Sequence, residues 1–135
     1  MNAQEFEALW REYENPEFER GMVAKMVALG RLPLSWQLAL VGVKDMVIAN
    51  QKPSRSPIAP GEGCLWPDGD GWRLLLGEAD DWDTVGHELA HAVLGIPKPG
   101  SYRTLAWAAE DFIESLCDTA AFYWLGAWRA MGCPR

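Results

Sequence analysis

Both histidines of this 135-residue chain lie in one five-residue segment, His87-Glu88-Leu89-Ala90-His91. Side chains four residues apart stand on the same face of an α-helix, so the two imidazoles can share one metal ion if this segment is helical. The pattern is H-E-x-x-H, in which Glu88 lies beside the two ligands and can reach a metal-bound water. The competing interpretation is a surface helix that carries two unrelated histidines. The sequence favours a helix with a metal site.

Size and composition limit what surrounds this helix. With 135 residues, of which 49% are hydrophobic, residues 1–135 are predicted to form one globular domain. The net charge of -7 and the scattered Lys and Arg residues argue against a nucleic-acid partner. No apolar segment is long enough to span a bilayer, and the polar start does not resemble a signal peptide. The three cysteines are widely spaced and odd in number, which does not suggest a disulfide framework. We therefore expect a cytoplasmic protein with reduced thiols and no membrane contact.

The N-terminal half is predicted to be mainly helical. Apolar residues recur at helical spacing over residues 3–14, and Asn15-Pro16 is typical of an N-cap followed by proline at the first helical position. The helix that follows can end at Gly30. A short helix capped by Ser35 and a strand over residues 45–49 are the expected continuation, although the periodicity of this stretch is ambiguous.

The C-terminal half is predicted to contain a hairpin and then two helices. Cys64–Trp66 and Trp72–Leu76 flank a run of turn residues, which is the signal of an antiparallel hairpin. Asp81 or Asp83 can cap the histidine helix. A long final helix is expected over residues 104–131. Together with the N-terminal helices, this order of elements predicts an α+β fold.

A catalytic zinc site needs a third protein ligand besides the two histidines. The chain contains no third histidine, so the candidates are carboxylates and cysteines. Glu114 and Asp118 are four residues apart on the predicted final helix, where Glu114 can coordinate the ion and Asp118 can accept the free N–H of a ligand histidine. Glu110, one turn earlier, and Cys64 are the alternative ligands. A solvated acidic stripe is the competing interpretation of the carboxylates.

This combination resembles the gluzincin metallopeptidases, in which H-E-x-x-H is followed by a glutamate ligand on a second helix. More specifically, the hairpin followed by residues 84–94 and 114–122 is similar to the ImmA/IrrE-type family of compact intracellular metallopeptidases. The resemblance covers residues 63–125. It does not extend to the N-terminal half or to a helix-turn-helix module, so the particular substrates of that family are not transferred.

The resemblance implies a minimal zincin-like domain with a Zn²⁺ cofactor bound by His87, His91 and Glu114. Glu88 would be the catalytic carboxylate, and Asp118 would hydrogen-bond a ligand histidine. The implied function is a zinc-dependent metallopeptidase, which hydrolyses peptide bonds of an intracellular protein or peptide substrate through a metal-bound water. The alternative is a non-proteolytic binding or regulatory protein on the same scaffold. The oligomeric state is left open.

A second resemblance rests on Glu62-Gly63-Cys64-Leu65 together with the histidine segment. It is similar to the peptide deformylases, in which a cysteine of E-G-C-L is the third ligand. The two segments are closer together here than in that family, its glycine-rich motif is missing, and Ala90 stands where that family has an aspartate. A deformylase-like hydrolase with Cys64 as ligand is therefore the less favoured alternative. Cys64 otherwise fits a small hydrophobic residue at the start of a strand.

Peptide hydrolysis also calls for a donor that stabilises the developing oxyanion besides the metal. Tyr102 and Arg103 are candidates, because they follow the histidine helix in a predicted loop that could line a cleft. Tyr123 is a third candidate. Ordinary loop or core roles compete with this function at all three positions. The strand over residues 72–76 could pair with an extended substrate backbone, or the loop before it could shield it.

Overall fold

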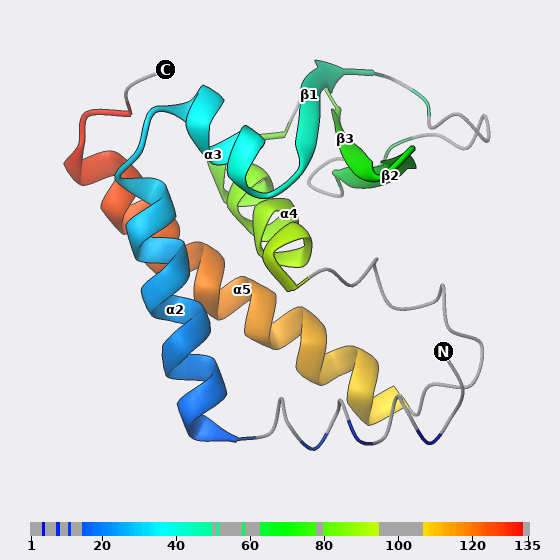
Figure 1. Cartoon of the computed structure of the whole chain (residues 1–135), viewed down its shortest axis with the longest axis vertical. Coiled ribbons are helices and arrows are strands. Elements are labelled where there is room, and N and C mark those ends of the chain that lie inside the picture. The colour runs from blue at the N-terminus through cyan, green and yellow to red at the C-terminus, as the bar shows by residue number, and fades with distance from the viewer. Residues whose placement is uncertain are drawn as a thin grey trace.

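The computed structural model describes residues 15–49, 51, 58, 63–77, 80–94 and 107–133, together with Gln4, Ala8 and Arg11, and residues 107–111 in their backbone only. The element order is α2 (Pro16–Gly30), α3 (Leu34–Leu40), β1 (Val43–Ile48), β2 (Cys64–Asp68), β3 (Gly71–Leu76), α4 (Trp82–Leu94) and α5 (Trp107–Ala130) (Figure 1). The predicted α+β fold is confirmed. Most of the helix predicted over residues 3–14 lies outside the described residues.

Helix α2 begins as the sequence predicts. The side chain of Asn15 accepts a hydrogen bond of 3.0 Å from the backbone N–H of Glu17, and Pro16 occupies the first helical position. Gly30 is the last helical residue, as expected. The cap that follows is Arg31 in a right-handed conformation, so Gly30 does not serve as a left-handed cap.

The predicted cap of α3 is wrong by two residues. Helix α3 begins at Leu34 with Pro33 as its N-cap, and no side chain caps it. The carbonyl oxygen of Pro33 accepts the backbone N–H groups of Trp36 and Gln37 at 3.0 and 3.1 Å. The extended backbone of Pro33 thus already starts the helix, which leaves Ser35 inside the first turn.

The three strands form one mixed sheet with β3 between β1 and β2. Strands β2 and β3 make the predicted antiparallel hairpin, with Gly69 at φ +63° in the turn. Strand β1 lies parallel to β3 on its other side, a pairing that no local sequence signal predicts. Both edges of β3 are therefore occupied, and the expectation that residues 72–76 pair with a substrate is wrong.

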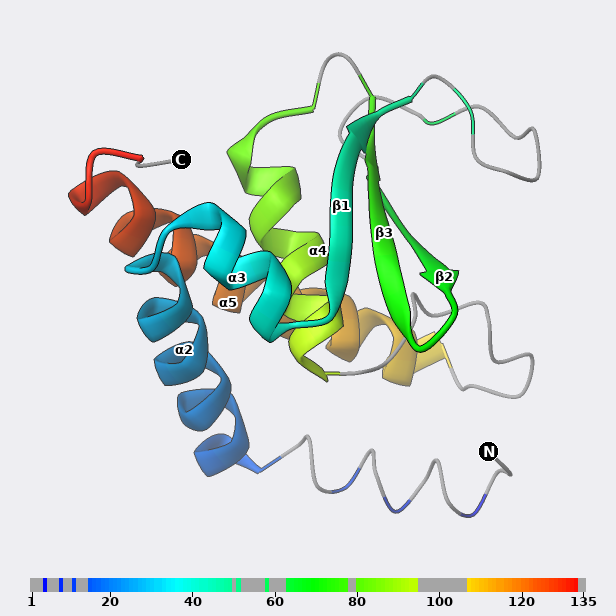
Figure 2. The same ribbon diagram turned by 45° about the horizontal axis from the view of Figure 1, so that its top comes forward.

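Helix α5 is the element on which the other long helices pack. Both α2 and α4 contact it, and α4 also contacts β2 and β3, so that α4 lies between the sheet and α5 (Figure 2). The core between these layers contains fully buried large side chains, among them Met26, Leu74, Leu89, Ile113, Trp124 and Trp128. None of the helices that the structure describes has the length and apolar character needed to cross a bilayer.

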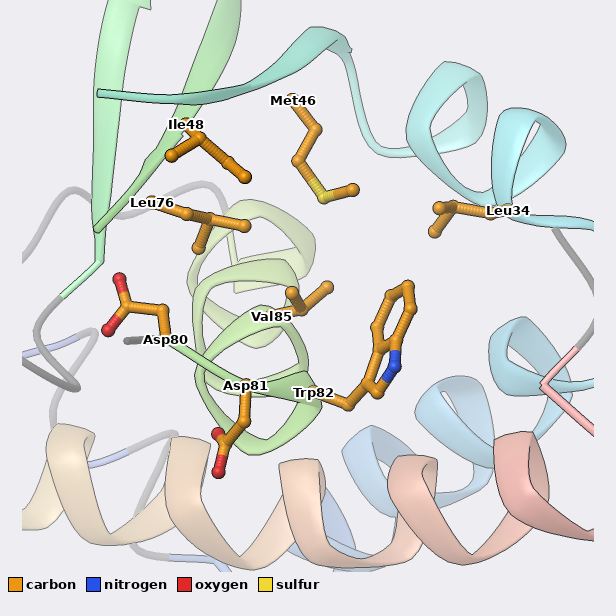
Figure 3. Close-up of a pocket in the computed structure, with 8 residues that line it drawn as sticks. All are labelled: Leu34, Met46, Ile48, Leu76, Asp80, Asp81, Trp82 and Val85. Carbon is orange, nitrogen blue, oxygen red and sulfur yellow. The ribbon is translucent and has the colours of Figure 1, made fainter. Parts of the chain in front are cut away.

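A pocket of about 400 Å³ lies between α3, the sheet and the start of α4 (Figure 3). Its lining is mainly apolar and consists of Leu34, Met46, Ile48, Leu76, Trp82 and Val85, with Asp80 and Asp81 on one side. The two aspartates hydrogen-bond the backbone: Asp80 accepts the N–H of Gly77 at 2.6 Å, and Asp81 accepts that of Thr84 at 3.3 Å. Of the two predicted caps of α4, Asp81 is thus the one used.

Candidate metal centre

Helix α4 presents both histidines on one face, as the spacing predicts. The Nε2 atoms of His87 and His91 are 3.2 Å apart, and their ring centroids are 4.9 Å apart. His91 is fully buried, whereas the side chain of His87 is 15% exposed. The pair therefore has one ring anchored in the core and one at the border with solvent.

Helix α5 brings Glu114 to this pair. Its Oε2 atom lies 2.9 Å from Nε2 of His87, and its Oε1 atom lies 3.2 Å from Nε2 of His91. Among the residues that the structure describes, these three form the group of possible metal ligands, and their ligand atoms all lie within 4.8 Å of one another. Cys64 is described and buried at the start of β2, but it is not part of this group. The side chain of Glu110 lies outside the described residues.

Asp118 lies where the sequence analysis expects it. Its Oδ1 atom is 2.7 Å from Nδ1 of His87. A carboxylate can only accept a hydrogen bond, so Nδ1 carries the proton and Nε2 is the atom that faces Glu114. Within the described part of the chain, the buried Nδ1 atom of His91 has no such partner, so packing and the contact of its Nε2 atom with Glu114 hold that ring.

The electrostatics of the group favour a positive charge. Burial lowers the pKa of His87, but the hydrogen bond to Glu114 and the charges of Glu114, Glu88 and Asp118 outweigh it and raise that pKa above its ordinary value. Hydrogen bonds from His87 and His91 hold the pKa of Glu114 well below its ordinary value. Without a metal, the carboxylates thus favour the protonated form of His87 more than water does.

The spacing of the three side chains fits a small tetrahedral ion. Bonds of about 2.0–2.1 Å to a tetrahedral zinc place neighbouring ligand atoms about 3.3–3.4 Å apart. The two Nε2 atoms, 3.2 Å apart, are close to that edge, and each has a different oxygen of Glu114 beside it, at 2.9 Å from His87 and 3.2 Å from His91. Two imidazoles and one carboxylate are a donor set of catalytic zinc sites, and no fourth His, Cys, Asp or Glu among the described residues joins them. The residues therefore fit a zinc ion that keeps one position open.

Glu88 of α4 is fully buried, and its side chain faces the residue that precedes β2. Gly63 lies against it: a Cβ atom there would be 3.1 Å from Cγ of Glu88 and 2.7 Å from Cγ2 of Thr84. Gly63 also has φ +56°, so both the space and the backbone require glycine. In the sequence, Gly63 stands out only within the deformylase-like segment, and no local signal reports its contact with Thr84 and Glu88.

Among the described residues, no candidate for stabilising an oxyanion is found at the site. Tyr102 and Arg103 lie outside those residues. Tyr123 is nine residues after Glu114, which places it about half a turn round α5 on the opposite side of the helix. Its side chain is 49% exposed and contacts the ring of Phe122 instead. The suggestion that Tyr123 stabilises an oxyanion is therefore wrong.

Cys117 is one residue before Asp118 and is fully buried. Burial raises the pKa of its thiol, and the nearby charges of Glu114, Glu88 and Asp118 raise it further. The thiol therefore stays neutral, and it is not part of the ligand group. Cys117 acts as a small core residue behind the site.

Comparison of the chain with protein-family models, with curated proteins and with solved structures found no match. The geometry of His87, His91 and Glu114 is therefore the observation that indicates a possible metal site.

Proposed function

We propose that this chain is a zinc-dependent metallopeptidase with His87, His91 and Glu114 as the zinc ligands and Glu88 as the catalytic carboxylate. The observation that carries the proposal is the position of Glu114, whose two oxygens lie 2.9 and 3.2 Å from the Nε2 atoms of the histidine pair. The two Nε2 atoms, 3.2 Å apart, are spaced like two corners of a zinc tetrahedron, and the carboxylate reaches both of them. An acidic stripe on a solvated helix would not need this spacing.

The proposed chemistry divides between the ion and the chain. A bound zinc ion would polarise the scissile carbonyl and lower the pKa of a coordinated water to about 7. Glu88 would accept a proton from the attacking water and pass it to the leaving amine. Asp118 would hold His87 in the tautomer that offers Nε2 to the ion. A structural zinc site requires no carboxylate with the role of Glu88, and this favours the peptidase over a binding protein on the same scaffold.

The proposed substrate is a peptide or protein segment. The net charge of -7 favours a basic segment, because opposite charges attract partners over several ångströms. The deformylase-like alternative is not favoured, since Cys64 is not in the group of possible ligands.

Metal analysis combined with proteolysis tests this function. We expect the wild type to bind one zinc per chain and to cleave members of a peptide library enriched in Lys and Arg. Glu88→Gln should keep the zinc and lose cleavage. The matched control is Glu19→Gln on the exposed surface of α2, which should behave as wild type. A wild type without zinc would refute the metal centre, and zinc without cleavage would favour the binding protein.

A further inference from the structure

Trp124 of α5 lies between the backbones of two other helices. A Cβ atom on Gly86 of α4 would be 2.6 Å from Cε3 of the indole, and one on Gly30 of α2 would be 2.8 Å from the carbonyl oxygen of Trp124 and 3.2 Å from its Cδ1. Real Cβ atoms essentially never come within 3.0 Å of such neighbours, so both positions require glycine for this packing. Because Cδ1 and Cε3 are on opposite edges of the indole, α2 and α4 approach the same side chain from two sides.

The indole of Trp124 is held in place by hydrogen bonds. Its Nε1 donates to Oε1 of Gln37 at 2.7 Å, and Nε2 of Gln37 donates to the carbonyl oxygen of Leu32 at 2.9 Å. Both side chains are fully buried, and the ring of Trp128 stacks on that of Trp124 with centroids 5.8 Å apart. The ring cannot turn aside without leaving a buried N–H unpaired. A larger residue at position 86 must therefore displace α4.

We infer that the contact between Gly86 and Trp124 sets the separation of α4 and α5 at the metal centre and makes both of them positioning residues for the ion. This inference rests on the proposed zinc site. Gly86 directly precedes His87, and the contacts of α4 run in the opposite direction along α5: Gly86 meets Trp124, and His87 meets Asp118 and Glu114. Any displacement of α4 at Gly86 thus moves His87 relative to both carboxylates.

The size of the displacement decides whether the geometry of the zinc ligands would change enough to weaken binding. Relieving the 2.6 Å approach to an ordinary contact of 3.4 Å needs a shift of roughly 0.8 Å. Functional side chains must be held within about 0.5 Å of their working geometry. A single added methyl group at position 86 is therefore enough to disturb the zinc ligands, although it touches none of them.

Two glycine-to-alanine variants separate positioning from general stability. Gly86→Ala presses on Trp124 from the side of the metal centre, whereas Gly30→Ala presses on the same tryptophan from α2. Gly126→Ala on the exposed side of α5 meets nothing within 4 Å and is the control without crowding. The measurements are zinc affinity by chelator competition, the visible absorption of the cobalt(II)-loaded protein, and thermal unfolding without metal.

We expect Gly86→Ala to weaken zinc binding about tenfold or more and to change the cobalt spectrum, as other changes around metal ligands do. Gly30→Ala should lower the unfolding temperature but keep the wild-type spectrum and affinity. Gly126→Ala should also keep the spectrum and affinity, and it should raise the unfolding temperature slightly, because alanine is the better helix former. Equal affinity and spectra for Gly86→Ala and wild type would overturn the inference, as would equal changes in the two buried variants.

If Gly86→Ala does not fold, Trp124→Phe removes the same contact and should also alter the cobalt spectrum. An unchanged spectrum in that variant would overturn the inference. A wild type that binds neither metal would refute the proposed zinc site itself, and the inference with it. The two failures are distinguishable, because only the first leaves wild-type binding intact.

Discussion

Nδ1 of His87 lies 2.7 Å from Oδ1 of Asp118, and Nε2 of the same ring lies 2.9 Å from Oε2 of Glu114. One imidazole is therefore held between two carboxylates that are one turn apart on a single helix. The contact between α4 and α5 that brings one carboxylate to His87 also brings the other. The packing of α4 against α5 thus both orients the ring of His87 and brings the possible third ligand to it.

Removing the charge at Asp118 should weaken metal binding without abolishing it. We expect Asp118→Ala to reduce zinc affinity about 10–100-fold, because the ring of His87 loses the partner that fixes its tautomer. Asp118→Asn should lose less, since the amide oxygen can still accept the hydrogen bond. Chelator competition measures both. Asp70→Asn, at a fully exposed side chain in the hairpin turn, is the control and should match wild type. Wild-type affinity in Asp118→Ala would contradict the role of Asp118.

The identity of the third ligand can be decided by substitution. Glu114→Gln should reduce zinc affinity by more than the roughly 10–100-fold that outer partners cost, whereas Cys64→Ser should leave it unchanged. Without metal, Glu114→Gln should also lower the pKa of His87. Burial lowers this pKa, and among the described groups only the charges of Glu88 and Asp118 remain in the variant to raise it. Zinc stoichiometry and an NMR titration of His87 measure the two effects. Loss of zinc in Cys64→Ser alone would support the deformylase-like alternative.

Zinc affinity should depend on pH in a direction set by His87. The ion binds the neutral imidazole, so a proton on His87 must leave first. Because the pKa of His87 is raised above 6.5, affinity should fall as pH drops through that raised pKa, by about tenfold per unit for one displaced proton. Glu114 stays ionised there, since its pKa lies well below 4.5. Calorimetry at several pH values should detect the released proton. An affinity that does not change between about pH 6 and pH 8 would contradict this prediction.

Gly63 should be intolerant of any side chain. Gly63→Ala combines the strain of φ +56° with a Cβ atom 2.7 Å from Thr84, so we expect a loss of roughly 2–4 kcal/mol in the free energy of unfolding. Gly42→Ala is the matched control, because Gly42 has φ +78° but nothing within 4 Å, and it should lose only about 1–2 kcal/mol. Urea unfolding of both variants separates strain from crowding. Equal losses would show that Thr84 and Glu88 yield to the added methyl group.

Local sequence determined much of the secondary structure and half of the candidate site. Asn15 and Pro16 start α2, the turn residues form the β2–β3 hairpin, and the four-residue spacing puts His87 and His91 on one face of α4. These features depend on neighbours within one helical turn or one hairpin. A single sequence displays such short-range relations directly.

Tertiary structure alone decided which distant groups meet. The parallel pairing of β1 with β3, the choice of Glu114 over Cys64 as neighbour of the histidines, and the glycine requirement at Gly63 and Gly86 all arise from contacts between elements far apart in the chain. Such contacts depend on how the helices and the sheet pack, and residue spacing along one element carries no record of that packing. The sequence by itself determined the imidazole pair, and the packing of α5 against α4 decided that a carboxylate completes it.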